Sequence, residues 1–553
     1  MKKNDVVTLT IEEINNLGCG VAHIPAPDGA RGQVVFVRDA VTGDDIDARI
    51  IKVNKSYLVA RIERILTPSP LRCTPDCTAA GCGGCVYRHV TYEHELELKR
   101  EYVKNAFRKA GLADVEVLPV RHTGELTGYR NKAQYPVREG KNGMEVGFFA
   151  TGTHRLVSAD SCNLQPPVFS ELTAFICDFC NRRSISAYDE ESGKGLLRHI
   201  YLRQGERTGE VMVCLVLNGE GFADEKKFVS ELNAAFPCVT SILINVNKEN
   251  TNVVLGERYR LIGGRDYIED ELCGLRFRIS AGAFYQVNHN ACELLYGIAK
   301  EQAALTGKET LLDLYCGIGT IGLSMADRAR EVIGIEIVDE AVKCAAENAR
   351  RNGIAHASFY CGDASDAKKL LENAERERGP LDAANTTVVF DPPRKGSTKE
   401  LIEYVSARDF RRVVYVSCNP DTLARDCVEF RRLGYQIGNV TPVDMFPRTG
   451  HVESVCLLSK LNARQHIEID LRMDELDLTA AEKKATYQEI KDYVLKHSGL
   501  NVSSLYIAQV KQKCGIIERE NYNKPKAEDS KQPQCPPDKE NAIMEALKRF
   551  GMI

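Results

Sequence analysis

Between about residues 281 and 460, short apolar runs alternate with amphipathic stretches of helical period. The apolar runs are TLLDLYC, EVIGIEI, ASFYCGD, TTVVFDPP, RRVVYVSCNP and VESVCLLSK. Strands that alternate with helices indicate a doubly wound, mostly parallel sheet, which binds ligands at the carboxyl ends of its strands. We therefore expect an α/β protein with a Rossmann-like domain over residues 281–460.

Two regions precede this domain. Residues 1–66 contain short alternating strands separated by turn residues such as Pro25, Pro27 and Gly29, which predicts a small β-barrel. Residues 67–280 begin with a proline-marked linker and a cysteine-rich segment, and continue as a mixed α/β domain.

The last region, residues 461–553, is predicted to be a small, mostly helical extension. Thr479 and Glu482 have the spacing of a capping box before a helical stretch, a second helix is expected after Ser503, and a third at 538–550. The arrangement allows a helix-turn-helix-like reader of nucleic acid or a docking lid. A polar, proline-rich linker separates the last two helices.

The composition is that of a soluble protein, with 43% hydrophobic residues and a formal net charge of −4. We find neither a signal peptide nor an apolar run of the roughly 18 residues that a membrane span needs, so we expect a cytoplasmic protein without a membrane partner. In that compartment the 20 cysteines should be core thiols, metal ligands or catalytic groups. Residues 99–141 contain ten Lys or Arg and five acidic residues. This excess of positive charge could attract the phosphate backbone of a nucleic acid, or it could belong to an ordinary solvated surface.

A glycine-rich turn follows the first strand of the Rossmann-like domain. Gly317, Gly319 and Gly322 form a G-x-G-x-x-G array, and Glu336 ends the next strand 19 residues beyond Gly317. Glycines let a ligand approach the backbone, and the acid accepts hydrogen bonds from ribose hydroxyls. The pair suits NAD and S-adenosylmethionine equally.

Two further strand ends favour methyl transfer. Asp391 precedes two prolines in FDPPRKG, a turn that can hold polar groups against a planar base, and Arg394 follows where adenine methyltransferases have an aromatic residue. Cys418 ends the next strand, where a thiolate could add to carbon 6 of uracil and activate carbon 5. Glu453 could then remove the proton from carbon 5. An inert buried thiol and a solvated carboxylate are the plainer interpretations of these two residues.

Five cysteines suggest a metal site. Cys73, Cys77, Cys82 and Cys85 lie close together in the sequence, and Cys162 follows later. Four thiolates could hold zinc or an iron–sulfur cluster, and spacing alone does not choose between them. Structural free thiols remain the alternative.

Taken in order, FYQVN, LDLYCGIGTIGL, FDPPRKG, VSCNP and HVESV resemble the RNA (uracil-5-)-methyltransferases. The amino-terminal barrel resembles a TRAM domain, and together with CGGC it points to the 23S ribosomal RNA branch of that family. The resemblance covers residues 1–460. It implies methylation of carbon 5 of a uridine in RNA that is flipped out of its loop.

The resemblance also implies roles for individual residues. Cys418 would be the nucleophile and Glu453 the base. The S-adenosylmethionine site would contain Gln286, Tyr315, Gly317, Glu336, Asp363 and Asp391. A 4Fe–4S cluster would be held by Cys77, Cys82, Cys85 and Cys162. Four residues separate Cys77 from Cys82, whereas the family has five at this place. Cys73 is therefore the alternative first ligand. We expect a monomer that binds 23S ribosomal RNA.

Three alternatives remain from the sequence. The substrate could be a transfer RNA, or the chain could be a noncatalytic RNA-binding iron–sulfur protein, against which an intact Asp391, Cys418 and Glu453 set argues. A radical enzyme of the TRAM-bearing methylthiotransferase type is the third, and the C-x3-C-x2-C triad of such enzymes is absent here.

Overall fold

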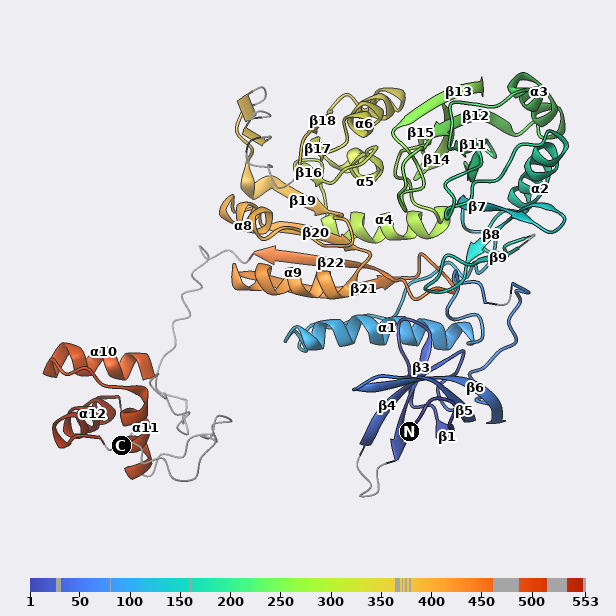
Figure 1. Ribbon diagram of the computed structural model, residues 1–553. Helices are drawn as coiled ribbons and strands as arrows, with labels where there is room; N and C mark the ends of the chain where they lie inside the picture. Colours follow the sequence, from blue (N-terminus) through green and yellow to red (C-terminus); the bar gives the residue numbers. More distant parts are fainter. Residues whose placement is uncertain are drawn as a thin grey trace. The chain divides into compact units, whose positions relative to one another are not determined.

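The computed structural model divides the chain into two compact units, Met1–Asn462 and Ala463–Ile553 (Figure 1). The residues that it describes are 1–25, 31–79, 81–159, 161–363, 369, 371–372, 375–376, 379–460, 487–514 and 535–550.

The chain begins with a curled sheet of six strands. They are β1 (Val6–Thr10), β2 (Glu13–Ile14), β3 (Cys19–Pro25), β4 (Arg31–Arg38), β5 (Asp45–Val53) and β6 (Tyr57–Thr67). Their order in the sheet is β1-β5-β6-β4-β3-β2, and only β4 and β6 run parallel. Alternate side chains such as Leu9, Val35 and Ile46 fill one shared core, as the sequence pattern predicts for residues 1–66.

A second sheet lies in the middle of the chain. Its strands are β7 (Lys132–Gly140), β8 (Gly143–Phe149), β9 (Leu156–Ser158), β10 (Leu197–Gln204), β11 (Val211–Leu217), β12 (Val239–Val246) and β13 (Arg258–Gly264). Helices α2 (Pro167–Arg182) and α3 (Glu225–Ala235) bury apolar side chains such as Phe179 and Phe228 against one face of this sheet. The order is β13-β12-β11-β10-β7-β8-β9.

The third sheet carries the predicted Rossmann-like domain. Its strands are β16 (Thr310–Leu314), β17 (Glu331–Glu336), β18 (Ala357–Cys361), β19 (Thr386–Phe390), β20 (Arg412–Ser417), β21 (Tyr435–Val443) and β22 (Glu453–Lys460). The order is β18-β17-β16-β19-β20-β22-β21; β16 to β20 are parallel, and β22 is antiparallel to both of its neighbours. The mostly parallel sheet is confirmed.

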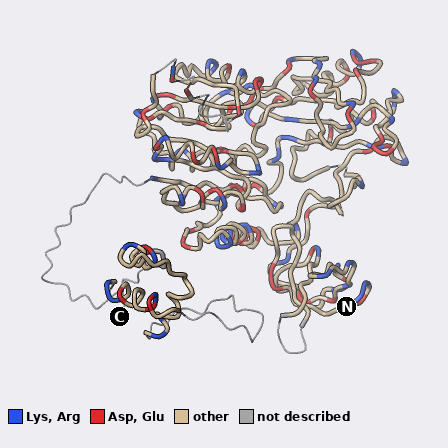
Figure 2. The backbone as a smooth tube through the Cα atoms, turned by 60° about the vertical axis from the view of Figure 1, so that its left-hand side comes forward, with Lys and Arg blue, Asp and Glu red and all other residues tan. Residues whose placement is uncertain are grey.

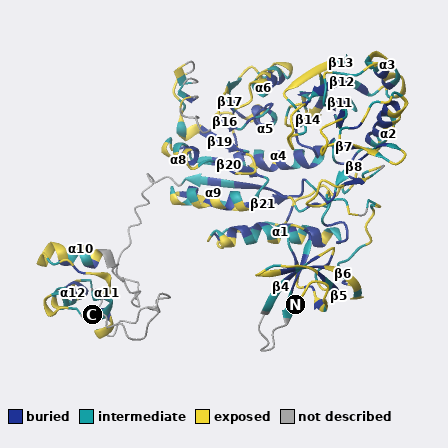
Figure 3. Cartoon of the chain, viewed as in Figure 1, coloured by how far each residue is buried: buried dark blue, intermediate teal, exposed yellow. Residues whose placement is uncertain are grey.

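Helices cover both faces of this sheet. One face packs with α4 (His289–Ala303), α5 (Thr320–Ser324), α6 (Asp339–Arg351) and the hairpin of β14 (Tyr267–Leu272) and β15 (Leu275–Ser280). The other face packs with α1 (Tyr92–Lys109), α8 (Lys399–Ala407) and α9 (Pro420–Arg432). Short 3-10 helices lie at Ala326–Arg328 and Ala383–Asn385. The central strands β16, β19 and β20 are almost wholly buried, whereas β18 at the edge of the sheet is partly exposed (Figure 3).

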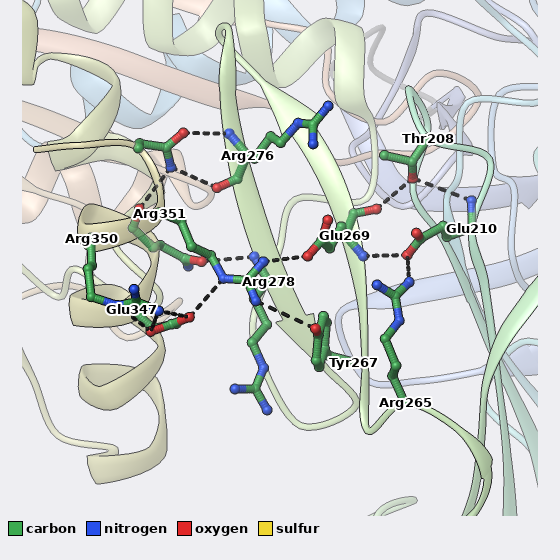
Figure 4. A network of polar contacts seen from close by, with 12 residues as sticks. Thr208, Glu210, Arg265, Tyr267, Glu269, Arg276, Arg278, Glu347, Arg350 and Arg351 are labelled. Atoms are coloured by element: carbon green, nitrogen blue, oxygen red, sulfur yellow. Dashed lines mark hydrogen bonds and ion pairs between the residues drawn. The ribbon is translucent and has the colours of Figure 1, made fainter.

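Two elements from the region predicted as the central domain pack on the Rossmann-like layers. Helix α1 lies against α9, because its Val103 and Phe107 belong to the same apolar core as Leu423 and Phe430. The β14–β15 hairpin lies against α6, and Figure 4 shows the polar contacts that hold it there.

Tyr267 of β14 is the centre of that polar contact region. The guanidinium groups of Arg265, Arg278 and Arg351 lie 4.9, 4.4 and 5.4 Å from its ring centroid. Arg351 also pairs with Glu269, so α6 is tied to the hairpin by stacking and by charge. The boundary predicted at residue 280 thus separates segments that share one core.

The second unit contains three helices, α10 (Tyr487–Ser498), α11 (Ser504–Lys513) and α12 (Pro537–Arg549). They share a small core that includes Ile490, Ile507 and Leu547. The helix predicted after Ser503 is present as α11, and the hydroxyl of Ser503 caps it by accepting the N–H of Tyr506 at 3.3 Å. The predicted capping box at 479–482 lies outside the described residues.

Basic and acidic residues are interspersed along the described chain (Figure 2). Among the helices in the described ranges, none combines the length and the apolarity that crossing a lipid bilayer requires.

Candidate active site and cysteine-lined cavity

Five of the predicted site residues lie at one edge of the third sheet. Tyr315 follows β16, Glu336 ends β17, Asp363 follows β18, Asp391 follows β19 and Cys418 follows β20. Because these five strands are parallel, their carboxyl ends meet at the same edge, which is where doubly wound sheets bind ligands.

The glycine-rich turn is shaped by backbone conformations that favour glycine. Gly317 and Gly319 have φ angles of 55° and 85°, in the left-handed region that side chains rarely adopt. The carboxylate of Glu336 accepts the N–H groups of Gly317 at 3.0 Å and Val338 at 2.9 Å. The predicted pairing of the turn with the acid of the second strand is therefore present in the fold.

Asp313 is a site residue that the sequence analysis missed. It is buried in β16, and one carboxylate oxygen accepts the N–H of Gly322 at 3.0 Å, while the other has no hydrogen-bond partner among the described residues. Burial, together with the charges of Asp391 and Glu336, raises the pKa of Asp313 to about 8. Its position as an acid inside the apolar run LLDLYC could have indicated this residue from the sequence.

These acids bear on the choice between the two cofactors. Asp313, Glu336 and Asp391 interact with one another through their charges around the glycine-rich turn. A cationic ligand such as a sulfonium would lower the raised pKa values of Asp313 and Asp391 and be stabilised by these carboxyl groups, whereas the pyrophosphate of NAD would be repelled by them. The residues present therefore fit S-adenosylmethionine better.

Gln286 lies in the segment that joins β15 to α4. Its carbonyl accepts the side-chain N–H of Asn131 at 3.0 Å, and the side chain of Asn288 donates to the carbonyl of Met445 at 3.1 Å. Gln286 is buried. The FYQVN segment is therefore fixed to the connection between β21 and β22, which leads directly to Glu453.

Cys418 and Glu453 lie at the adjoining ends of two paired strands. The β20–β22 ladder ends at the pair Ser417–Ser454; Cys418 directly follows Ser417, and Glu453 directly precedes Ser454. Burial raises the pKa of the Cys418 thiol to about 11, with further contributions from the charges of Glu453 and Asp391, while Arg394 lowers it.

The two carboxyl groups of this site are also perturbed. Burial and the charge of Asp391 raise the pKa of Glu453 to about 8, with Arg394 acting in the opposite direction. Burial alone raises the pKa of Asp391 to about 7. The thiol of Cys418, two carboxyl groups and the exposed guanidinium of Arg394 thus form one electrostatically coupled group, of which Glu453 is buried, and such coupling is typical of catalytic sites.

The D-P-P-R turn is held against the beginning of α9. The side chain of Asn419 donates to the carbonyl of Arg394 at 3.0 Å, and the hydroxyl of Thr422 donates to the same carbonyl at 3.4 Å. The Arg394 guanidinium lies 3.4 Å from a ring nitrogen of His451. Burial and Arg394 lower the pKa of His451 to about 4, so this ring is neutral at pH 7. The sequence analysis did not predict His451.

The cysteines predicted as metal ligands line a second site. Cys77, Cys82, Cys85 and Cys162 all border one cavity of about 640 Å³. Gly83 permits the tight turn between two of them, because a Cβ there would lie 2.9 Å from the carbonyl oxygen of Phe149.

Cys73 is oriented differently. Its thiol lies 3.3 Å from the carbonyl oxygen of Arg88 and 3.2 Å from that of Val90, and it does not line the cavity. Of the two candidates for the first ligand, the geometry thus favours Cys77.

The described residues contain no group of three or more potential ligands close enough together to hold one metal ion. A zinc site brings its thiolates to about 2.3 Å from a single atom. The four thiols that border the cavity are a donor set of the kind that zinc or an iron–sulfur cluster requires.

Two domain families match the chain. Residues 91–461 match the family model of the tRNA (Uracil-5-)-methyltransferases, and residues 2–62 match the TRAM domain. The chain belongs to the RNA (uracil-5-)-methyltransferase family. Members of this S-adenosylmethionine-dependent family methylate RNA, so the protein is an RNA methyltransferase with an amino-terminal TRAM domain.

Relatives of the methyltransferase support the same assignment. An uncharacterized RNA methyltransferase of Halalkalibacterium halodurans is 39% identical over 466 residues, which are 84% of this chain and 98% of the relative. One from Clostridium acetobutylicum is 36% identical over 467 residues, again 84% and 98% of the two chains.

A solved structure is similar over most of the first unit. The Pyrococcus abyssi tRNA (uracil-54, C5)-methyltransferase in complex with S-adenosyl-L-homocysteine aligns with a TM-score of 0.64 and 27% identity. The alignment covers 82% of this chain and all of that one.

Proposed function

We propose that this methyltransferase modifies carbon 5 of a uridine in 23S ribosomal RNA through a covalent adduct with Cys418. The observation that carries the proposal is the position of Cys418 and Glu453 beside the last pair of the β20–β22 ladder, where the charge of Glu453 acts on the Cys418 thiol. Carbon 5 of uracil needs a nucleophile on carbon 6 and a base for its proton, and the site offers one thiol and one buried carboxyl group for these tasks.

The chemical steps follow from these two groups. The Cys418 thiolate bonds to carbon 6, and carbon 5 attacks the methyl carbon of the sulfonium donor, whose carbon–sulfur bond breaks with the electron pair left on sulfur. Glu453 then removes the proton from carbon 5. The electrons of that bond form the double bond between carbons 5 and 6, and the bond between carbon 6 and Cys418 breaks.

The free Cys418 thiol is protonated at pH 7, because its pKa is about 11. The thiolate therefore requires positive charge beside it. Arg394 supplies part of this charge, and a sulfonium ligand in the acidic site would supply more. Binding of the methyl donor should accordingly activate the nucleophile.

The proposed donor site consists of Gln286, Tyr315, Gly317, Glu336, Asp363 and Asp391. Its position around the glycine-rich turn, where the Glu336 carboxylate accepts the N–H of Gly317 and the Asp313 carboxyl group accepts that of Gly322, supports this proposal. The archaeal neighbour contains S-adenosyl-L-homocysteine, the demethylated product of the same donor.

We also infer that Cys77, Cys82, Cys85 and Cys162 hold a 4Fe–4S cluster. The shared cavity supports this ligand set, and the orientation of Cys73 toward two carbonyls argues for Cys77 as the first ligand. When bound, such a cluster would supply iron–thiolate bonds that tie the cysteine-rich segment to the loop containing Cys162.

Transfer RNA is the second candidate substrate. It is favoured by the description of the matching family and by the activity named for the archaeal neighbour. Mapping of 5-methyluridine by mass spectrometry in ribosomal and transfer RNA, from cells with and without the gene, separates the candidates. Loss of the nucleoside from one 23S position supports the proposal, whereas loss from transfer RNA alone refutes the ribosomal assignment.

A further inference from the structure

The connection between β21 and β22, residues 444–452, leads directly into Glu453 and is held at every carbonyl from Met445 to Arg448. The carbonyl of Met445 accepts from Asn288, and that of Phe446 accepts from Lys99. The hydroxyl of Tyr129 donates to the carbonyl of Pro447, and the backbone N–H groups of Val86 and Tyr87 donate to the carbonyl of Arg448.

Lys99 is the centre of the contacts beneath this connection. Its ammonium group donates to Glu95 at 2.8 Å, to Asp444 at 2.7 Å and to the carbonyl of Phe446 at 3.1 Å. The lysine side chain is 1% exposed and both carboxylates are fully buried. An ammonium group has three protons, and each has an acceptor here.

The partners of Lys99 hold the connection as well. Glu95 accepts the N–H of Arg448 at 2.7 Å, and Asp444 accepts the hydroxyl of Tyr92 at 2.9 Å. Arg448 supplies the second cation, since its guanidinium lies 3.4 Å from Glu95. Two buried carboxylates therefore face two cations, so the group is balanced in charge.

The same connection touches the cysteine-rich segment and the TRAM domain. Val86 and Tyr87, which hold the carbonyl of Arg448, directly follow Cys85. A Cβ on Gly450 would lie 1.9 Å from the carbonyl oxygen of Asn16, so the connection is in close contact with the amino-terminal sheet. Arg448 itself has a φ angle of 70°, a backbone conformation that its neighbours must hold in place.

We propose that Lys99 is a positioning residue that fixes residues 444–452 and thereby aims Glu453 at the proton on carbon 5. This inference rests on the proposed role of Glu453. A small displacement of a catalytic group is costly, since about 1 Å of misplacement can slow a step about 100-fold. Loss of the Lys99 contacts should thus slow proton removal while leaving the earlier addition and methyl transfer in place.

The test uses the full-length protein with a methyl donor and a substrate RNA, and measures the fraction of enzyme in a denaturation-resistant RNA adduct. Lys99→Met should raise that fraction about tenfold over the wild type, as slower release of the adduct would. Lys104→Met is the matched control, because Lys104 lies on the same helix, is 40% exposed and pairs only with Glu101 among the described residues. It should behave as the wild type does.

A purely structural role predicts a different result. In Lys99→Met the buried Asp444 loses its cation. The double variant Lys99→Met with Asp444→Asn restores the charge balance but not the hydrogen bonds that Lys99 makes to residues 444–452. If the double variant regains the melting temperature of the wild type but still accumulates the RNA adduct, the result supports a positioning role for Lys99. Recovery of both stability and product release overturns the proposal.

Two further variants keep the outcome decisive. If Lys99→Met does not fold, Tyr129→Phe removes only the hydrogen bond to Pro447, and the same rise in adduct is expected. Glu453→Gln identifies the source of a failure. If Glu453→Gln accumulates adduct but Lys99→Met and Tyr129→Phe do not, only the positioning proposal is refuted. If Glu453→Gln does not accumulate adduct, both the base assignment and the positioning proposal are refuted.

Discussion

Cys418 and Glu453 adjoin the last pair of the β20–β22 ladder, Ser417–Ser454, and burial together with the charge of Glu453 raises the pKa of the Cys418 thiol. A thiol directly follows the last residue of β20, and β22 begins on a carboxyl group. The antiparallel strand β22, added beside the parallel strands β16 to β20, brings the proposed nucleophile and the proposed base to the same edge of the sheet.

The pKa of Glu453 predicts how product release depends on pH. A base acts in its deprotonated form, so release of the methylated RNA should accelerate as the pH rises through about 8 and level off above that value. Glu453→Gln should slow release about 10²- to 10⁴-fold and remove this dependence. Quenched-flow measurement of adduct decay between pH 6 and 10 checks the prediction, and a retained pH dependence in the variant would assign the base to another group.

Stability should depend on pH through the same residue. Folding raises the pKa of Glu453 from 4.5 to about 8, so its protonated form is favoured in the folded state and the free energy of unfolding falls as the pH rises through this interval. Glu453→Gln should therefore melt at a higher temperature than the wild type at pH 9 and at a similar one at pH 4. The exposed Glu400→Gln is the control, and an equal effect of the two variants at pH 9 would contradict the account.

The cysteine-lined cavity predicts the ligands of the cluster. Protein purified without oxygen should be brown and contain about four irons per chain. Cys77→Ser, Cys82→Ser, Cys85→Ser and Cys162→Ser should each lose the colour. Cys73→Ser should keep it, since the Cys73 thiol lies against two backbone carbonyls. Stoichiometric zinc, or bleaching by Cys73→Ser with retention of colour by Cys77→Ser, would overturn the ligand set.

The helical extension should be separable from donor binding. All residues proposed to bind the methyl donor belong to the first unit, and α10, α11 and α12 have a core of their own. Deletion of residues 466–553 should leave the affinity for S-adenosylmethionine unchanged in calorimetry and should weaken RNA binding or alter the choice of site. Loss of donor binding would show that the extension belongs to the catalytic unit, and unchanged RNA affinity and site choice would exclude a role in recognition.

Local pattern was sufficient to locate the strand ends. Gly317, Asp391 and Cys418 each follow an apolar run, and parallel strands place the ends of such runs at one edge. The positions of these turns could therefore be predicted from spacing, whereas the roles of Cys418 and Glu453 stay predictions from the family resemblance. β21 was missed, because Gly438 and Pro442 give its sequence the character of a turn.

Contacts between distant segments could not be predicted in this way. Lys99 and Asp444 are 345 residues apart, and nothing in either local sequence indicates that they pair. The choice between Cys73 and Cys77 likewise depends on where each thiol points after folding. Helix α1 has an apolar face, but its periodicity does not say which sheet that face covers.

Trapping of the nucleophile tests the central claim most directly. The protein is incubated with the methyl donor and a substrate RNA that contains 5-fluorouridine, which has no proton to remove at carbon 5, and the denatured adduct is digested and sequenced by mass spectrometry. The exposed Cys361→Ala is the control, because this cysteine lies at the end of β18, away from the proposed nucleophile. The account predicts a nucleotide linked to the peptide containing Cys418 in the wild type and in Cys361→Ala, and no adduct in Cys418→Ala. An adduct on another residue, or undiminished methylation of natural RNA by Cys418→Ala, would contradict it.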